Sequence, residues 1–108
     1  MTPRARMIVA ATQAIGSRGF VNEAPQFVEV HLTDPLDPES VPRCAVIVTT
    51  ARRVTFHHCV AKHHTEPNNK EWRRYAVIHP EIAKGSKKWP EQLAIFAVSR
   101  LIDDSGGA

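Results

Sequence analysis

Two stretches of the chain carry hydrophobic residues at the three- and four-residue spacing of a helix. The first follows Pro3, which suits a helix start, and ends before Gly16 or Gly19; its apolar positions are Met7, Ile8, Ala11 and Ile15. The second follows Pro90, and its apolar stripe is Leu93, Phe96, Ala97 and Leu101, widened by Ile95, Val98 and Ile102. We therefore expect helices over 4–15 and from residue 90 onward. A strand over 7–11 or over 93–101 is the alternative at each place.

The region between these helices is instead rich in β-branched and alternating apolar residues. It predicts strands over 27–32, 44–50, 54–61 and 72–78, with a tight connection at 51–53 that makes a hairpin of the second and third. Loops are expected at 34–42, which holds three prolines, at 64–70 and at 81–89. The order predicts an α+β fold: an antiparallel sheet of three to four strands with the N- and C-terminal helices on one face. Residues 1–108 are expected to form a single domain, with a flexible tail over 103–108.

The net charge of the chain does not by itself identify a binding partner. The chain has 108 residues, 43% of them hydrophobic, and a net charge of +3, which permits nucleic acid as a partner without requiring it. The region 23–40 is mainly acidic, whereas 52–88 is mainly basic. Cys44 and Cys59 do not make a disulfide framework, so we expect an intracellular protein, cytoplasmic or organellar. No apolar run reaches the ~20 residues of a membrane span, so no membrane is expected as partner.

The most informative motif is the basic start of the second helix, Ser86-Lys87-Lys88. Two lysines there add full charges to the partial positive charge of a helix N-terminus, where backbone N–H groups lack helical partners. This arrangement suits phosphate.

The same segment resembles a known family. Ser86-Lys87-Lys88, then Gln92 and the apolar run to Leu101, resemble the second helix of the double-stranded-RNA-binding domain, and the sequence over 25–28 resembles the start of that family's first strand. The resemblance implies a fold of helix, three strands and helix, and lysines that bind phosphates across the major groove of duplex RNA. Two features depart from the family. Glu91 stands where a further basic residue is usual, and the family's Gly-Pro-x-His loop has no match in the acidic segment 34–42.

We therefore expect a non-catalytic RNA-binding module of this type, without cofactor, whose partner is structured RNA. The residues expected to contact nucleic acid are Lys84, Lys87, Lys88, Lys70, Arg73 and Arg74. The last two adjoin Trp72 and Tyr75, and basic residues interleaved with aromatics suit single strands as well. The alternative is a domain of the same fold that has lost RNA binding and serves as a protein-interaction or homodimerisation module, which predicts an exposed apolar or strand-edge surface.

A histidine cluster supports a more distant alternative. His57, His58, Cys59, His63 and His64 fall within eight residues, and on a strand His57, Cys59 and His63 share one face. A zinc site would use these three, whereas a metal-dependent nuclease would use His57, His58, Asn69 and His79. Because no paired Cys-x-x-Cys is present and Pro80 follows His79 directly, we expect neither a metal site nor catalytic residues.

Overall fold

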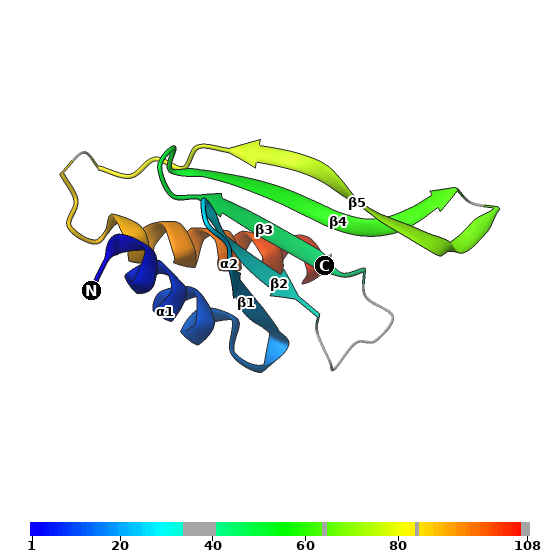
Figure 1. Cartoon of the computed structure of the whole chain (residues 1–108), viewed down its shortest axis with the longest axis horizontal. Helices are drawn as coiled ribbons and strands as arrows, with labels where there is room; N and C mark the ends of the chain where they lie inside the picture. The colour runs from blue at the N-terminus through cyan, green and yellow to red at the C-terminus, as the bar shows by residue number, and fades with distance from the viewer. Residues whose placement is uncertain (34–40, 64, 84, 107–108) are drawn as a thin grey trace.

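The described residues of the chain form one antiparallel sheet and two α-helices, which confirms the α+β class (Figure 1). The computed structural model describes residues 1–33, 41–63, 65–83 and 85–106. Its elements are, in order, α1 (Pro3–Ile15), a 3-10 turn (Gly16–Arg18), β1 (Gly19–Glu23), β2 (Phe27–Leu32), β3 (Arg43–Val48), β4 (Arg53–His63), β5 (Glu66–Ile78) and α2 (Trp89–Gly106). The sheet thus has five strands where three to four were expected.

The sheet is a simple meander in which each strand pairs with the next along the chain, in the order β1-β2-β3-β4-β5. The strand that the sequence did not predict is β1, a five-residue edge strand in which Gly19 lies opposite Leu32. A Cβ on Gly19 would overlap the backbone oxygen of His31. Glycine is therefore required at this position by the close approach of the first two strands.

Local signals explain both ends of α1. The side chain of Thr2 caps the helix by accepting a hydrogen bond from the backbone N–H of Ala5 at 3.1 Å, and Pro3 takes the first helical position. At the other end Gly16 has a φ of 54°, and its N–H donates to the carbonyl of Thr12. The helical prediction is confirmed here, and the strand alternative over 7–11 is wrong.

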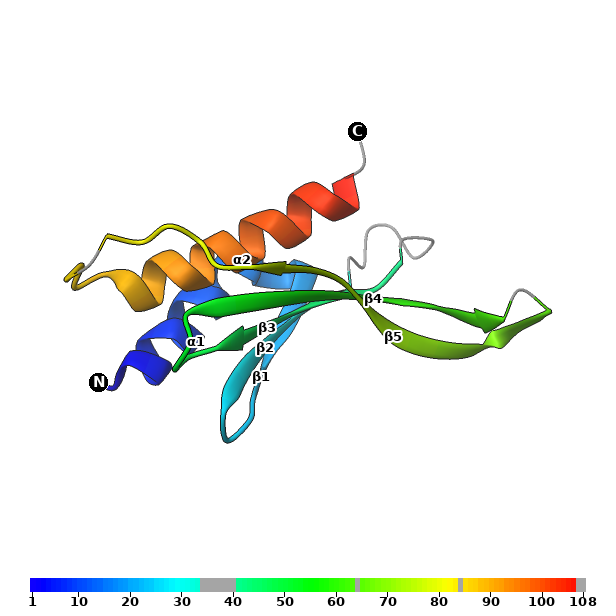
Figure 2. The ribbon, with the colours of Figure 1, turned by 90° about the horizontal axis from the view of Figure 1, so that it is seen from above.

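Both helices cover the same face of the sheet, as expected (Figure 2). The core lies between the helices and strands β2, β3 and β4, whose alternate side chains point toward the helices. Its fully or almost fully buried members are Met7, Ala11, Ile15, Val28, Val30, Leu32, Ala45, Ile47, Val54, Phe56, Leu93, Ala94, Ala97, Val98 and Leu101. Burial of this apolar surface is the main source of stability.

Strands β4 and β5 extend well beyond the helices as a two-stranded arm (Figures 1 and 2). The loop expected over 64–70 is wrong, because β5 already begins at Glu66, with Lys70 opposite Ala61. Turn-forming residues such as Asn68 and Asn69 are overridden here by pairing with a neighbouring strand. The molecule is accordingly elongated, with extents of 49 × 28 × 25 Å.

Helix α2 is longer than predicted at its C-terminal end. The helix begins at Trp89 and continues through Gly106. The helical prediction is therefore confirmed, and the strand alternative over 93–101 is wrong. The predicted tail at 103–108 is therefore helical as far as residue 106. The carboxylate of Asp104 accepts hydrogen bonds from Tyr75 of β5 at 2.6 Å and from Arg100 at 3.0 Å. Residues 107–108, and most of the acidic segment predicted as a loop (34–40), lie outside the described residues.

Candidate nucleic-acid interface

The face of the sheet opposite the helices carries a row of polar and aromatic side chains. Strand pairing sets one residue from each strand side by side across the whole sheet, in the order Phe20, His31, Cys44, His57 and Arg74. Neighbours of these residues along each strand, such as Val30 and Phe56, point into the core. In the part of the chain that the structure describes, no helix covers this row (Figure 2).

Three rings cluster on this uncovered face. The imidazole of His31 stacks on Phe20, with ring centroids 4.7 Å apart and planes inclined by 5°. Trp72 approaches the same imidazole edge-on, at 5.7 Å and 80°. The side chains of Phe20 and Trp72 are each 47% exposed. Flat aromatic surface that reaches solvent on a sheet is the arrangement on which unpaired nucleic-acid bases stack.

A shallow hollow of about 210 Å³ adjoins two of these rings, those of His31 and Trp72, and its other lining residues are Glu29, Cys44, Val46 and His57. The His31 Nε2 lies 3.3 Å from the Glu29 carboxylate and 3.6 Å from the Cys44 sulfur. Burial, helped by the negative charge of Glu29, raises the pKa of the Cys44 thiol to about 12, so the thiol stays protonated. Burial, together with the positive charge of Arg74, lowers the pKa of His57. The hollow therefore offers a protonated thiol, two imidazoles and one carboxylate, with no activated nucleophile at Cys44.

Two of the predicted basic residues flank these rings. Lys70 and Arg74 are exposed, and they share the uncovered face with Trp72 because they lie two positions from it on β5. Arg73 points to the other face, where its guanidinium pairs with Glu71 at 2.7 Å and donates to the carbonyl of Lys62 at 3.4 Å. Lys70 and Arg74 thus join the aromatic cluster, whereas Arg73 belongs to the opposite face of the arm.

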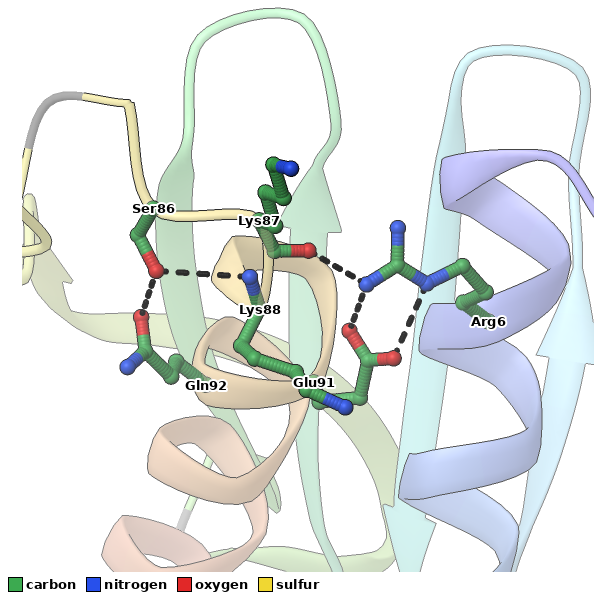
Figure 3. Close-up of polar contacts among 6 residues, drawn as sticks. All are labelled: Arg6, Ser86, Lys87, Lys88, Glu91 and Gln92. Carbon is green, nitrogen blue, oxygen red and sulfur yellow. Dashed lines mark hydrogen bonds and ion pairs between the residues drawn. The ribbon is translucent and has the colours of Figure 1, made fainter.

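Of the other predicted residues, the two that the structure describes lie at the start of α2, at the opposite end of the long axis from the tip of the arm (Figure 1). Lys87 and Lys88 are exposed there, and the backbone N–H of Lys88 donates to Ser86 Oγ at 3.3 Å (Figure 3). Lys84 lies outside the described residues. The five predicted residues that the structure describes therefore do not form one site.

The N-terminus of α2 is also less accessible to a phosphate than its sequence suggested. Glu91 accepts two hydrogen bonds from the Arg6 guanidinium of α1, at 2.9 and 2.7 Å, and the same guanidinium donates to the carbonyl of Lys87 (Figure 3). Pro90 has no N–H to offer, and Glu91 places a carboxylate in the first turn of the helix. Glu91 thus ties the two helices together and occupies the position where a phosphate would meet the helix terminus.

This ion pair makes stability sensitive to acid. The hydrogen bonds from Arg6 hold the pKa of Glu91 below its ordinary value of 4.5, so the stabilisation is complete above pH 4.5 and is lost as the pH falls through the lower folded value. We expect E91Q to be less stable than the wild type at pH 7 and the difference to shrink progressively as the pH is lowered below 4.5. Urea unfolding over a series of pH values from 7 downward measures it; a difference of equal size at every pH would contradict the role of the charge.

The histidine cluster does not assemble a metal site in the part of the chain that the structure describes. His57 and Cys59 do share the uncovered face, as their spacing predicted, but no group of three metal-ligating side chains is brought together there. A register shift separates Ala61 from His63, and His58 packs against Tyr75, with ring centroids 5.1 Å apart. His64 lies outside the described residues.

The sequence missed Phe20, His31 and Cys44 as members of a site. One signal was available: Val28, Val30 and Leu32 alternate as a core face, which leaves Glu29 and His31 on the other side of the strand. Nothing in the sequence showed that β1 would place Phe20 against His31, because that pairing depends on an unpredicted strand.

Comparison with models of protein families, with curated proteins and with solved structures finds no match to this chain. The described helices include none that is long and apolar enough to cross a membrane. The class of this protein is thus defined by its fold alone, an α+β domain with a five-stranded meander and helices on one face.

Proposed function

We propose that this chain is a non-catalytic RNA-binding module that binds structured RNA with unpaired bases through the uncovered face of its sheet. The observation that carries the proposal is the half-exposed Trp72, which lies between Lys70 and Arg74 on that face. Phosphates would pair with the two cations, while an unpaired base would stack on the indole. The resemblance of the Ser86-Lys87-Lys88 segment to the double-stranded-RNA-binding domain supports RNA as the nucleic acid.

Lys87 and Lys88 would contribute to RNA binding only indirectly, because of their position. They lie at the far end of the molecule from the arm, and the terminus beside them is filled by Glu91. They would add long-range attraction for phosphate, while the sheet face would supply the contacts that hold the base. The thiols of Cys44 and Cys59 are both free, which fits an intracellular, reducing compartment.

Replacement of Trp72 by alanine tests the proposal. A labelled RNA hairpin with an unpaired loop, a fully paired RNA duplex and the matching DNA hairpin are each titrated with wild type and W72A. Loss of one stacked base costs about 1–3 kcal/mol, so the affinity of W72A for the hairpin should fall about 5- to 150-fold. Ile95 is similarly exposed, at 51%, but belongs to α2, so I95A serves as the matched control.

Fluorescence gives an independent readout of the same contact. The chain has two tryptophans, Trp72 and Trp89. In a W89F background the emission of Trp72 should be quenched when the hairpin loop binds, because a stacked base contacts the indole directly. Unchanged affinity of W72A for every probe, together with unquenched emission, would rule out the sheet face as the RNA site.

A second candidate function is protein interaction, and the free edge of β5 favours it. This strand has 13 residues and, among the described residues, pairs only with β4. An edge of that length offers a row of backbone N–H and C=O groups to another strand.

A further inference from the structure

The sequence along the free edge of β5 favours one register of antiparallel pairing with a second copy of the chain. An antiparallel pair of identical strands in one continuous sheet is related by a twofold axis perpendicular to that sheet. Residues directly opposite each other must project from the same face, so they are separated by an even number of positions along the strand. The axis therefore passes through one residue position, and the residue at that position lies opposite its own copy.

This symmetry restricts the possible registers of β5. Its regularly paired stretch, before the register shift at Tyr75, includes Lys70, Glu71, Trp72, Arg73 and Arg74. Trp72 is the single uncharged residue of these five. An axis through any of the other four would place a charged residue against its own copy, which is destabilising, and would not bring Glu71 opposite Arg73.

The register centred on Trp72 pairs opposite charges on one of its two faces. It places Glu71 of each copy opposite the partner's Arg73, twice by symmetry, on the face that bears the helices. Glu71 and Arg73 already form an ion pair within one chain at 2.7 Å, with side chains 35% and 54% exposed. The pairing would convert two separate ion pairs into one network of four charges. On the other face, the half-exposed Trp72 would gain apolar contact with its copy.

We propose that two copies of this chain pair antiparallel along β5, with Trp72 on the twofold axis, and so join their sheets into one. The same register places Lys70 opposite the partner's Arg74 on the uncovered face, which gathers four cations around the two indoles. These cations repel one another until an anion binds between them. Tighter pairing in the presence of RNA would depend on the proposed function, whereas the dimer itself would not.

Sedimentation equilibrium of the full chain without RNA tests the dimer, since the single chain has a mass of 12.0 kDa. The wild type should sediment at twice that mass. R73E places glutamate opposite glutamate and should weaken the dimer about tenfold or more. The charge-swapped variant E71R/R73E restores opposite charges across the axis and should recover the wild-type dissociation constant. Both changes lie on the face away from Lys70 and Arg74, so RNA affinity per chain can be followed separately.

A cysteine crosslink tests the register. Cys59 lies opposite Trp72 within the chain, so it is first replaced by serine. In the C59S background, W72C should form a disulfide between two copies on mild oxidation, because this position lies opposite its own copy. R74C in the same background should crosslink poorly, since it faces the partner's Lys70.

Three outcomes would overturn the proposal. The first is a wild type that stays monomeric from micromolar to millimolar concentration, which would leave the edge to a strand of another protein. The second is a dimer that R73E does not weaken. The third is a dimer that crosslinks through position 74 and not 72.

Discussion

Reversing the charges of Lys70 and Arg74 together (K70E/R74E) should reduce affinity for an RNA hairpin about 100-fold or more. Both residues are exposed on the uncovered sheet face beside Trp72. A hydrogen bond to a charged group is worth about 1.5–3 kcal/mol, so loss of two such contacts to phosphate amounts to about 3 kcal/mol at least. Loss of two phosphate contacts should also reduce the slope of log affinity against log salt concentration by about 1.4–1.8 in magnitude.

The matched control for this variant is K87E/K88E. It makes the same change of charge, so both variants alter the overall attraction for RNA equally, but it does so at the start of α2, at the other end of the molecule. Measurement of RNA binding at several salt concentrations separates the two sites. If K87E/K88E loses binding while K70E/R74E keeps it, RNA would bind at the helix start, as in the double-stranded-RNA-binding domain, and the sheet-face proposal would fail.

Replacement of Phe56 by alanine should destabilise the fold by about 3–5 kcal/mol, the usual range for a large buried aromatic. Phe56 is fully buried on the helix-bearing face of β4. Its ring lies 6.2 Å from those of Tyr75 and Phe96, and the guanidinium of Arg100 lies 5.7 Å from its centroid. Truncation leaves a cavity that residues from β5 and α2 fill only in part.

Thermal unfolding followed by circular dichroism measures this effect. In a domain of this size, 1 kcal/mol shifts the melting temperature by roughly 4 °C or more, so F56A should melt at least about 12 °C below the wild type. I95A, which truncates a half-exposed side chain of α2, should remain within about 0.5 kcal/mol of the wild type. A loss of less than 1 kcal/mol in F56A would show that the contact between sheet and α2 is not the centre of the core.

The helices were predictable because each carries its own signals. Apolar spacing, the proline at the first turn and Gly16 at the end of α1 are all local in sequence, and the structure confirms them. The alternation over 27–32 likewise marked β2 and its two faces. The sequence missed β1 and predicted too short an arm for β4 and β5. These segments contain residues with a weak preference for β-structure, so their extended conformation depends on pairing with a neighbouring strand.

A β-bulge shows how pairing also decides which side chains meet. Strict alternation along 72–78 places Ala76 with Trp72 and Arg74 on one face, and Val77 on the other. In the structure an extra residue, Tyr75, interrupts the ladder between Phe56 and His57, so Ala76 lies opposite buried Phe56 and Val77 is 44% exposed. Tyr75 itself stays on the helix-bearing face, where its hydroxyl donates to Asp104 of α2.

The sequence by itself determined the α+β class, both helices, the core-facing stripes and the basic residues available for an anionic partner. Tertiary structure alone decided which of those residues share a surface. It joined Phe20, His31, Cys44, His57 and Arg74 in one row, separated Lys87 and Lys88 from the arm, and paired Glu91 with Arg6. Helical spacing and caps act within a few residues, whereas strand register and ion pairs between helices join residues far apart in the chain.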